Sequence, residues 1–288
     1  MTDRRVTVDG RTVALVDLGD PQGAPVFLFH GTPDSRLGKD FADAPARERG
    51  LRVLCPDRGG IGGSDPVPGR TIAGYADEVT ALADVLGLDR FATVGYSAGG
   101  PFALACAAGC GPRVTGTALM AGAGPIDDRP GARDGLAASD LELLETIEQR
   151  PARAATMLRI QRLATRLAPS MAIKQIAGEL AAPDREFLAR RPPAEEMSFF
   201  LESLRQGPAG VIEEYRLWAG PWHLDWSAVT APVEIFQGEE DGMVPMHHAE
   251  DIAARLPAGL ARVHRLPATG HLSIQDHIGD VLDALATP

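Results

Sequence analysis

Short apolar runs alternate with helix-compatible stretches over the first 123 residues of the chain. Four of these runs have the length expected of strands in a sheet that is buried on both faces: 25–29, 51–55, 91–96 and 114–120. The stretches between them predict helices over 36–49, 72–86 and 101–110. Strands that alternate with helices of this length are typical of a mainly parallel sheet with right-handed crossovers.

The same kind of pattern is found at both ends of the chain. Residues 6–18 alternate apolar and polar side chains around Asp9-Gly10, which predicts an antiparallel β-hairpin. After residue 232, strands are predicted over 233–237 and 261–266, and helices over 246–256 and 271–286.

Between residues 124 and 220 the pattern changes to helices alone. Helices are predicted over 141–149, 152–167, 171–180 and 197–205, with prolines between them. We therefore expect an α/β core domain formed by 1–123 and 221–288, and an inserted helical cap, or lid, formed by 124–220. Methionine and aromatic residues of this cap can line an apolar substrate pocket, although residues at such spacing more often form the core between helices.

The segment Gly95-Tyr96-Ser97-Ala98-Gly99 follows the apolar run at 91–94 directly. Two glycines flank Ser97 at minus two and plus two, and they remove side chains that would clash where a strand turns sharply into a helix. This spacing predicts a nucleophile elbow with an exposed serine hydroxyl. By itself the five-residue pattern is only moderately specific, because a plain glycine turn has the same composition.

A serine hydroxyl needs a base, and histidine is the side chain whose pKa best suits that role. His271 follows Gly270 directly after the last predicted strand, which places it at the same sheet edge as Ser97 if the strands are parallel. The other six histidines fit less well, since they fall inside predicted strands or helices, at the end of the insertion, or before the glycine loop: His30, His223, His247, His248, His264 and His277.

The base in turn needs a carboxylate that fixes its tautomer. Asp241 lies on the loop after the predicted strand at 233–237, which is the strand before the one that leads to His271. It is the predicted acid. Its competitors are Glu239, Glu240 and Asp127, and a solvated acidic turn is the alternative interpretation. Backbone N–H groups of Thr32 and Ala98 are the predicted oxyanion hole, with Gly31 allowing close approach. A simple turn at 30–33 is the alternative there.

Composition narrows the classes of partner. The chain has 288 residues, of which 44% are hydrophobic and 23% charged, and its 28 Lys and Arg against 39 Asp and Glu give a net charge of −11. This charge argues against nucleic acid and anionic membrane surfaces as partners. No apolar stretch is long enough for a signal core or a bilayer span, so we expect a cytoplasmic protein, and the many Ala, Arg, Gly and Pro residues suggest a bacterial source.

Neither a metal site nor a disulfide is expected from the sequence. Cys106 and Cys110 are four residues apart on a predicted helix, which favours packed, reduced thiols, and the same is expected of Cys55. His247 and Asp251 share a helix face, but two ligands do not make a metal site.

Taken together, these segments resemble the α/β-hydrolase fold superfamily, in the serine hydrolase or esterase-like branch with a helical lid, over nearly the whole chain. The matching segments occur in the family's order: the oxyanion loop at 30–33, the glycine-rich loop at 57–65, the nucleophile elbow at 95–99, the acid Asp241, and the base in Gly270-His271. A serine at the elbow argues against the dehalogenase and epoxide hydrolase branches, which use an aspartate there.

The resemblance implies a serine hydrolase with a Ser97, His271 and Asp241 catalytic triad. We expect it to cleave an ester-like bond, whether carboxylester, lactone or thioester, of a small apolar molecule through an acyl-enzyme, with no metal or organic cofactor. The alternatives on the same fold are a carbon–carbon bond hydrolase, a cofactor-free perhydrolase, a lyase and a non-catalytic small-molecule-binding relative. The partner is then a small-molecule substrate, and the sequence is compatible with a homo-oligomer.

Overall fold

Apolar side chains are buried on both faces of the central sheet in the computed structural model, which describes residues 1–286. Along β3 (Ala24–Phe29), Phe27 and Phe29 join the apolar cluster on one face, whereas Val26 and Leu28 join the cluster on the other. Successive side chains of a strand point to opposite faces, so a sheet covered on both sides requires such a continuous apolar run.

Within the described residues, eight strands form one sheet in the order β1-β2-β4-β3-β5-β6-β7-β8. The remaining strands are β1 (Thr2–Val8), β2 (Arg11–Gly19), β4 (Leu51–Pro56), β5 (Phe91–Tyr96), β6 (Val114–Met120), β7 (Val233–Gly238) and β8 (Ala261–Leu266). The pairs β1–β2 and β2–β4 are antiparallel, and the other neighbours are parallel. The predicted hairpin and the mainly parallel sheet are thus confirmed.

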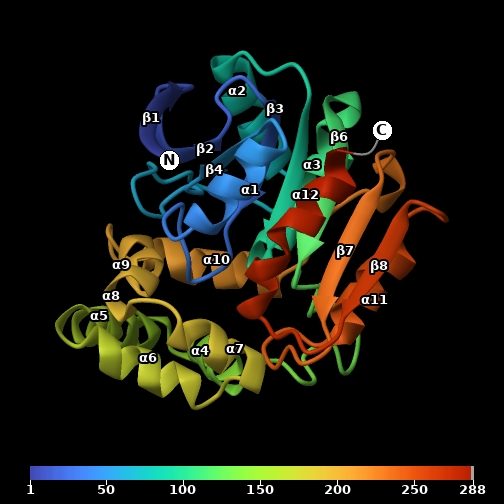
Figure 1. Ribbon diagram of the computed structural model, residues 1–288. Helices are drawn as coiled ribbons and strands as arrows, with labels where there is room; N and C mark the ends of the chain where they lie inside the picture. The colour runs from blue at the N-terminus through green and yellow to red at the C-terminus, as the bar shows by residue number, and fades with distance from the viewer. Residues whose placement is uncertain (287–288) are drawn as a thin grey trace.

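Helices cover both faces of this sheet (Figure 1). One face packs against α1 (Asp43–Glu48) and α12 (Ile278–Ala286), and the other against α2 (Tyr75–Leu86), α3 (Gly100–Gly109) and α11 (Met246–Arg255). Short 3-10 turns lie between the regular elements: η1 (Asp40–Ala42), η2 (Ser97–Gly99), η3 (Gly111–Arg113), η4 (Trp226–Ala228) and η5 (Ser273–His277).

Two predicted helices are shorter than expected. The helix predicted over 36–49 begins only at Asp43, because Gly38 adopts φ +69°, a left-handed conformation that interrupts a helix. The helix predicted over 271–286 becomes regular only at Ile278. Before it, backbone N–H groups of 271–273 donate to a side chain from another part of the chain.

Between β6 and β7 the chain forms helices α4 to α10, which we call the helical insertion (residues 138–219). Its helices are α4 (Ala138–Gln149), α5 (Pro151–Leu167), α6 (Pro169–Ala177), α7 (Ala182–Ala189), α8 (Pro193–Glu196), α9 (Ser198–Ser203) and α10 (Ala209–Ala219). The sequence analysis missed α7, α8 and α10. Prolines interpreted as breaks, Pro183 and Pro193, lie instead in the first turns of α7 and α8, where a missing N–H costs little.

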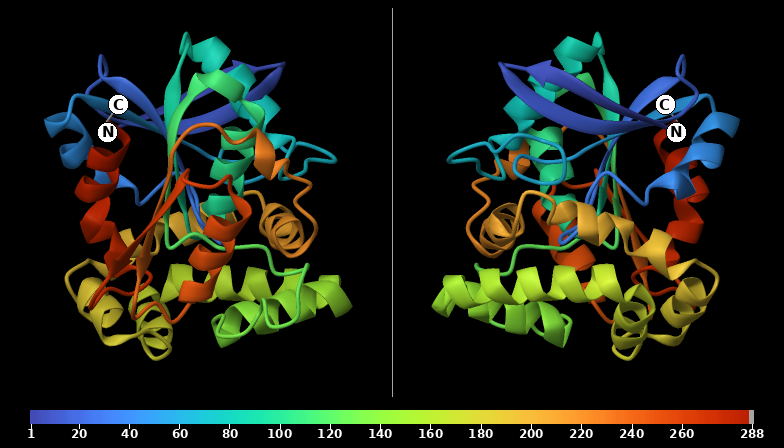
Figure 2. Two further views of the ribbon diagram at one scale, coloured as in Figure 1. Left: turned by 90° about the vertical axis from the view of Figure 1, so that its right-hand side faces the viewer. Right: turned by 90° about the vertical axis from the view of Figure 1, so that its left-hand side faces the viewer.

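The helical insertion packs at one end of the core, next to the carboxyl ends of the parallel strands (Figures 1 and 2). In both views of Figure 2, the long helix α5 runs across the foot of the molecule. That these helices act as a cap with the predicted boundaries stays a prediction. Over residues 1–286, the structure has no helix that is long and apolar enough to cross a membrane.

Candidate active site

Ser97 occupies the sharp turn between β5 and α3. Its φ is +54°, a conformation that non-glycine residues rarely adopt. A Cβ added at Gly99 would lie 2.1 Å from the carbonyl oxygen of Phe29, and one added at Gly95 would lie 2.7 Å from the Cα of Gly100. Both glycines are therefore required by close backbone packing, and the strand-to-helix turn expected at 95–99 is present.

His271 lies in the loop after β8 and faces Ser97. Its Nε2 is 3.0 Å from Ser97 Oγ, although the two residues are 174 positions apart in the chain. The imidazole is almost fully buried, and the Tyr96 hydroxyl donates to the backbone carbonyl of His271 at 3.1 Å. The structure thus brings the predicted nucleophile and the predicted base into hydrogen-bond contact.

Asp241 approaches the same imidazole from the other side. Its Oδ2 is 2.9 Å from His271 Nδ1, and the carboxylate is fully buried. Three further donors hold it: the Gln237 side-chain amide at 3.0 Å on Oδ2, and the backbone N–H groups of Met243 and Val244 at 2.8 Å on Oδ1. With Nδ1–H donating to Asp241, Nε2 is left to accept the Ser97 hydroxyl proton.

The competing carboxylates lie elsewhere. Glu239, Glu240 and Asp127 are exposed, whereas Asp241 is in contact with His271. Proximity in sequence could not separate Glu239 and Glu240 from Asp241. The difference is that Asp241 points back toward the backbone of its own turn, where its two N–H donors lie.

Opposing effects act on the pKa of His271. Burial disfavours the charged imidazolium and lowers the pKa, but the charge and the hydrogen bond of Asp241, together with the charges of Asp184 and Asp140, outweigh it. The net result is a pKa above the usual 6.5. This direction suits a group that must take a proton from a hydroxyl and hold it.

The loop at residues 30–33 runs beside Ser97. A Cβ added at Gly31 would lie 3.2 Å from Ser97 Cβ, so a larger residue there would press on the nucleophile. Thr32 follows Gly31 in this loop, and Ala98 follows Ser97 in the turn η2. Each predicted oxyanion residue is thus one position away in the chain from a residue at this contact, and the binding of an oxyanion by the N–H groups of Thr32 and Ala98 stays a prediction.

A buried arginine holds this loop, and the sequence analysis did not single it out. Arg58 Nη1 donates to the carbonyl of His30 at 2.6 Å, and Nη2 donates to the carbonyl of Gly31 at 2.8 Å and to Thr32 Oγ1 at 3.2 Å. Its guanidinium also stacks 4.3 Å from the ring centre of Phe102. The signal in the sequence was its place two residues after the strand at 51–56 and directly before the glycines.

Glu214, on α10 of the helical insertion, neutralises Arg58. Two hydrogen bonds of 2.6 Å join the carboxylate to Arg58 Nε and Nη2, and the Thr32 hydroxyl donates to the same carboxylate. Burial alone would raise the pKa of Glu214, but Arg58 and Arg70 outweigh it and hold that pKa well below its usual range. A charged side chain of the insertion thus helps to hold the loop at residues 30–33.

Two other buried histidines have structural environments. His30 is fully buried, and its Nδ1 donates to the carbonyl oxygen of Gly31 at 2.8 Å. Burial lowers its pKa to about 3. His248 accepts the N–H of Gly124 at 2.8 Å, and burial lowers its pKa to about 4. Both are therefore neutral near pH 7. The cysteines are all free and buried, and among residues 1–286 there is no group of three or more metal-ligating side chains.

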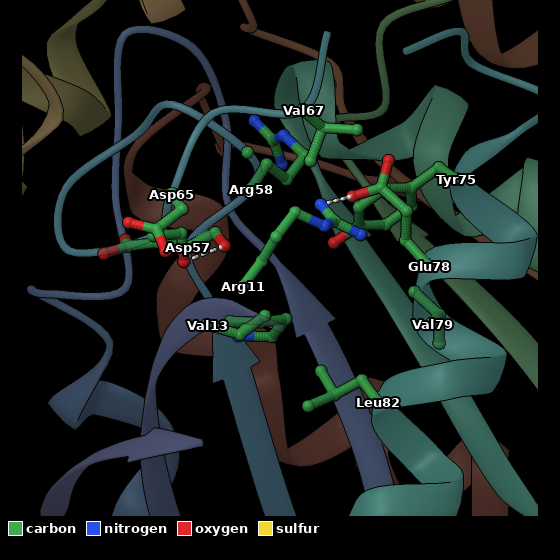
Figure 3. A pocket seen from close by; sticks show the side chains of 13 residues that line it. Arg11, Val13, Asp57, Arg58, Asp65, Val67, Tyr75, Glu78, Val79 and Leu82 are labelled. Atoms are coloured by element: carbon green, nitrogen blue, oxygen red, sulfur yellow. Dashed lines mark hydrogen bonds and ion pairs between the residues drawn. The ribbon is translucent and has the colours of Figure 1, made fainter. Parts of the chain in front are cut away.

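A pocket lies next to Arg58, but it is separate from Ser97. Figure 3 shows Arg11 extending toward Glu78, 3.8 Å away, with Arg58, Asp57 and Tyr75 around them. Neither Ser97 nor His271 lines this pocket. Charged side chains, among them Arg11 and Glu78, are part of its lining, and it is not where Ser97, His271 and Asp241 meet.

Comparison with known proteins finds curated relatives that match part of the chain. A bifunctional esterase/perhydrolase from Acinetobacter calcoaceticus is 39% identical over 99 residues, which are 33% of this chain and 34% of that protein. The chain thus spans about a third of the length of the curated relatives it matches.

Solved structures match over nearly the whole chain. An esterase from Exiguobacterium antarcticum has a TM-score of 0.73 at 20% identity and covers 98% of both chains. An enol-lactonase from Burkholderia xenovorans LB400 has a TM-score of 0.72 at 19% identity, over 99% of this chain and 100% of that one. At such identities the likeness shows a shared fold. The family model described as the alpha/beta hydrolase fold matches residues 24–278, from the first parallel strand to the last helix, and the chain therefore belongs to the α/β hydrolase family.

Proposed function

We propose that the chain is a serine hydrolase that cleaves an ester-like bond, whether carboxylester, lactone or thioester, of a small apolar molecule. The observation that carries this proposal is the pair of hydrogen bonds that links Ser97 Oγ to His271 Nε2 at 3.0 Å and His271 Nδ1 to Asp241 at 2.9 Å. A hydroxyl at the end of such a pair is an activated nucleophile.

The reaction follows from the positions of these groups. Ser97 Oγ attacks the carbonyl carbon while His271 Nε2 takes its proton, and the N–H groups of Thr32 and Ala98 bind the oxyanion of the tetrahedral intermediate. His271 then returns the proton to the leaving alcohol or thiol, which leaves an acyl group on Ser97. Water, deprotonated by the same imidazole, releases the acid.

The apolar surroundings of the site support a substrate with an apolar acyl group. Met243 and Leu272 are close neighbours in sequence of Asp241 and His271, and they pack against Leu180, Phe187 and Leu188. These three leucine and phenylalanine residues all lie in the helical insertion, in α7 or just before it. An apolar cluster thus adjoins the segments that carry Asp241 and His271, which favours an apolar acyl group.

Labelling with a serine-directed fluorophosphonate tests the nucleophile. Wild-type protein is expected to incorporate one phosphonyl group per chain and to lose esterase turnover, whereas Ser97→Ala is expected to incorporate none. A panel of activated esters graded by acyl length then measures the preferred acyl group. Equal labelling of Ser97→Ala, or turnover that survives it, would exclude Ser97 as the nucleophile.

Perhydrolysis is the second candidate, because the Acinetobacter calcoaceticus relative is named as an esterase and a perhydrolase. Hydrogen peroxide would then replace water in attack on the acyl-enzyme and release a peracid. Measuring peracid formation from an ester in the presence of peroxide, with Ser97→Ala as the control, separates the two outcomes of one acyl-enzyme.

A further inference from the structure

A second carboxylate of the helical insertion reaches the site, and it belongs to none of the groups described above. Asp184 lies in the first turn of α7, directly after Pro183, and its side chain is fully buried. Within residues 1–286 the structure records no ion pair for Asp184. Its charge is met instead by backbone N–H groups of the loop that carries His271.

Four donors converge on this carboxylate. Oδ2 accepts the backbone N–H of His271 at 2.8 Å. Oδ1 accepts the N–H of Leu272 at 2.9 Å, the N–H of Ser273 at 2.8 Å and the Ser273 hydroxyl at 2.9 Å. The Ser273 hydroxyl in turn accepts the N–H of Gly270 at 2.8 Å. Every backbone N–H from 270 to 273 is therefore fixed directly or indirectly by one side chain.

The loop is shaped to admit this carboxylate. A Cβ added at Gly270 would lie 2.4 Å from Asp184 Oδ1, so only glycine allows the approach. Consecutive N–H groups that point at one anion form a backbone nest, and hydrogen bonds to a charged acceptor are about twice as strong as neutral ones. Figure 1 shows α7 below the chain that leads into α12, and this position brings Asp184 within hydrogen-bond distance of the loop that carries His271.

We infer that Asp184 is a positioning residue for the proposed hydrolysis, because it fixes the backbone of His271 and thereby holds Nε2 at Ser97. This inference rests on the proposed function. It assigns to the helical insertion a part in the reaction geometry, beyond covering the sheet edge. Without Asp184 the loop loses its shared acceptor, the N–H groups of 271–273 turn to other partners, and the imidazole loses its fixed distance to Ser97.

The carboxylate also contributes to the electrostatics of His271. The charged and titratable groups around the imidazole are Asp241 after β7, Asp184 on α7 and Asp140 on α4, together with the Ser97 hydroxyl and the Tyr96 phenol. All three carboxylates favour the imidazolium and act to raise the pKa of His271. Removing the charge of Asp184 should therefore shift the acidic limb of kcat/KM to lower pH.

The test compares Asp184→Asn with Glu186→Gln. Glu186 is exposed two residues further along the same helix, so its substitution removes the same charge without touching the loop. Active-site titration with the fluorophosphonate counts the competent sites of each preparation, and kcat is expressed per titrated site. Asp184→Asn is expected to lower kcat per site by about 10- to 100-fold, with a smaller change in KM, since slight misplacement of a reacting group costs that much. Glu186→Gln is expected to match wild type.

The outcomes are distinguishable. An unchanged kcat per titrated site in Asp184→Asn, with or without a lower yield of folded protein, would show that Asp184 only stabilises the fold and would overturn the inference. If Asp184→Asn does not fold, Ser273→Ala takes its place, since it removes one donor and the link to Gly270. A loss of a few-fold in kcat per site supports the inference, and no loss overturns it. Failure of the proposed function itself appears separately, as turnover that survives Ser97→Ala.

Discussion

At the scale of single residues, the site depends on side chains that the surrounding structure holds in one conformation. Ser97 is held at a positive φ by flanking glycines, and Asp241 is bound by four donors. His271 lies between them. An imidazole held in one tautomer and at one distance is ready to transfer a proton without reorganisation, which is the main way in which a preorganised site lowers a barrier.

The pH dependence of activity belongs to this scale. His271 must be neutral to accept the serine proton, and Asp241 raises its pKa above 6.5. We expect kcat/KM to fall with one proton as pH decreases through a value above 6.5, and Asp241→Asn to move this limb to lower pH while it lowers kcat by on the order of 10³- to 10⁴-fold. A pH–rate profile with a neutral ester measures both. A wild-type limb below 6.5 would contradict the assignment of His271.

The same shift acts on stability with the opposite sign. A histidine whose pKa is raised by folding contributes stability that is fully present below its unfolded pKa. That contribution is lost as pH rises through the folded value. The pH range that favours activity is thus the range in which the His271 and Asp241 pair contributes least to stability.

At the scale of elements, two insertion helices reach loops that follow core strands. Glu214 of α10 binds Arg58 and Thr32, and Asp184 of α7 binds the loop after β8. Buried carboxylates are costly unless they are paired or hydrogen-bonded, and both of these are satisfied by the core. The helical insertion and the core loops therefore depend on each other for the stability of these charged groups.

The pair Glu214→Gln and Glu213→Gln tests this dependence. Glu214→Gln leaves the buried Arg58 without its carboxylate, and removal of one partner of a buried pair costs about 3–5 kcal/mol. Glu213 is the adjacent residue, is 39% exposed and pairs with Arg70, so its substitution is expected to cost under about 1 kcal/mol. Urea unfolding gives both free energies. Equal costs for the two variants would show that Arg58 finds its compensation elsewhere.

At the scale of the whole molecule, one apolar cluster runs from the sheet into the helical insertion. It contains Phe27 and Phe102 of the core together with Leu144 and Tyr215 of the insertion. The two buried carboxylates add polar links across the same boundary. Such continuity favours a single cooperative transition over separate unfolding of two parts.

Tryptophan fluorescence can test this continuity, because the three tryptophans of the chain, Trp218, Trp222 and Trp226, all lie near the junction between α10 and β7. We expect their fluorescence transition in urea to coincide with the far-UV circular dichroism transition, which follows all helices and strands. A fluorescence midpoint well below the dichroism midpoint would instead show that the junction between α10 and β7 unfolds before the rest of the molecule.

Local patterns in the sequence determined much of this protein. The strands were predictable because the buried runs and the Asp9-Gly10 turn are encoded within a few neighbouring residues. Ser97, Asp241 and His271 could be chosen because each follows a strand, and the ends of parallel strands share one edge of a sheet. Helix boundaries were less predictable, because Pro183 and Pro193 are compatible both with a break and with a first turn.

Only the tertiary structure decided which charges are buried. Arg58, Asp184 and Glu214 lie in segments whose pattern is also that of a solvated loop or helix face, and their partners lie up to 182 residues away. Periodicity reports which side of an element is apolar, but not which polar side chain will meet a donor on another element. Hydrogen-bond pairing over such distances exists only when the chain is folded, and it is this pairing that holds the loop at residues 30–33 and the backbone of His271 in place.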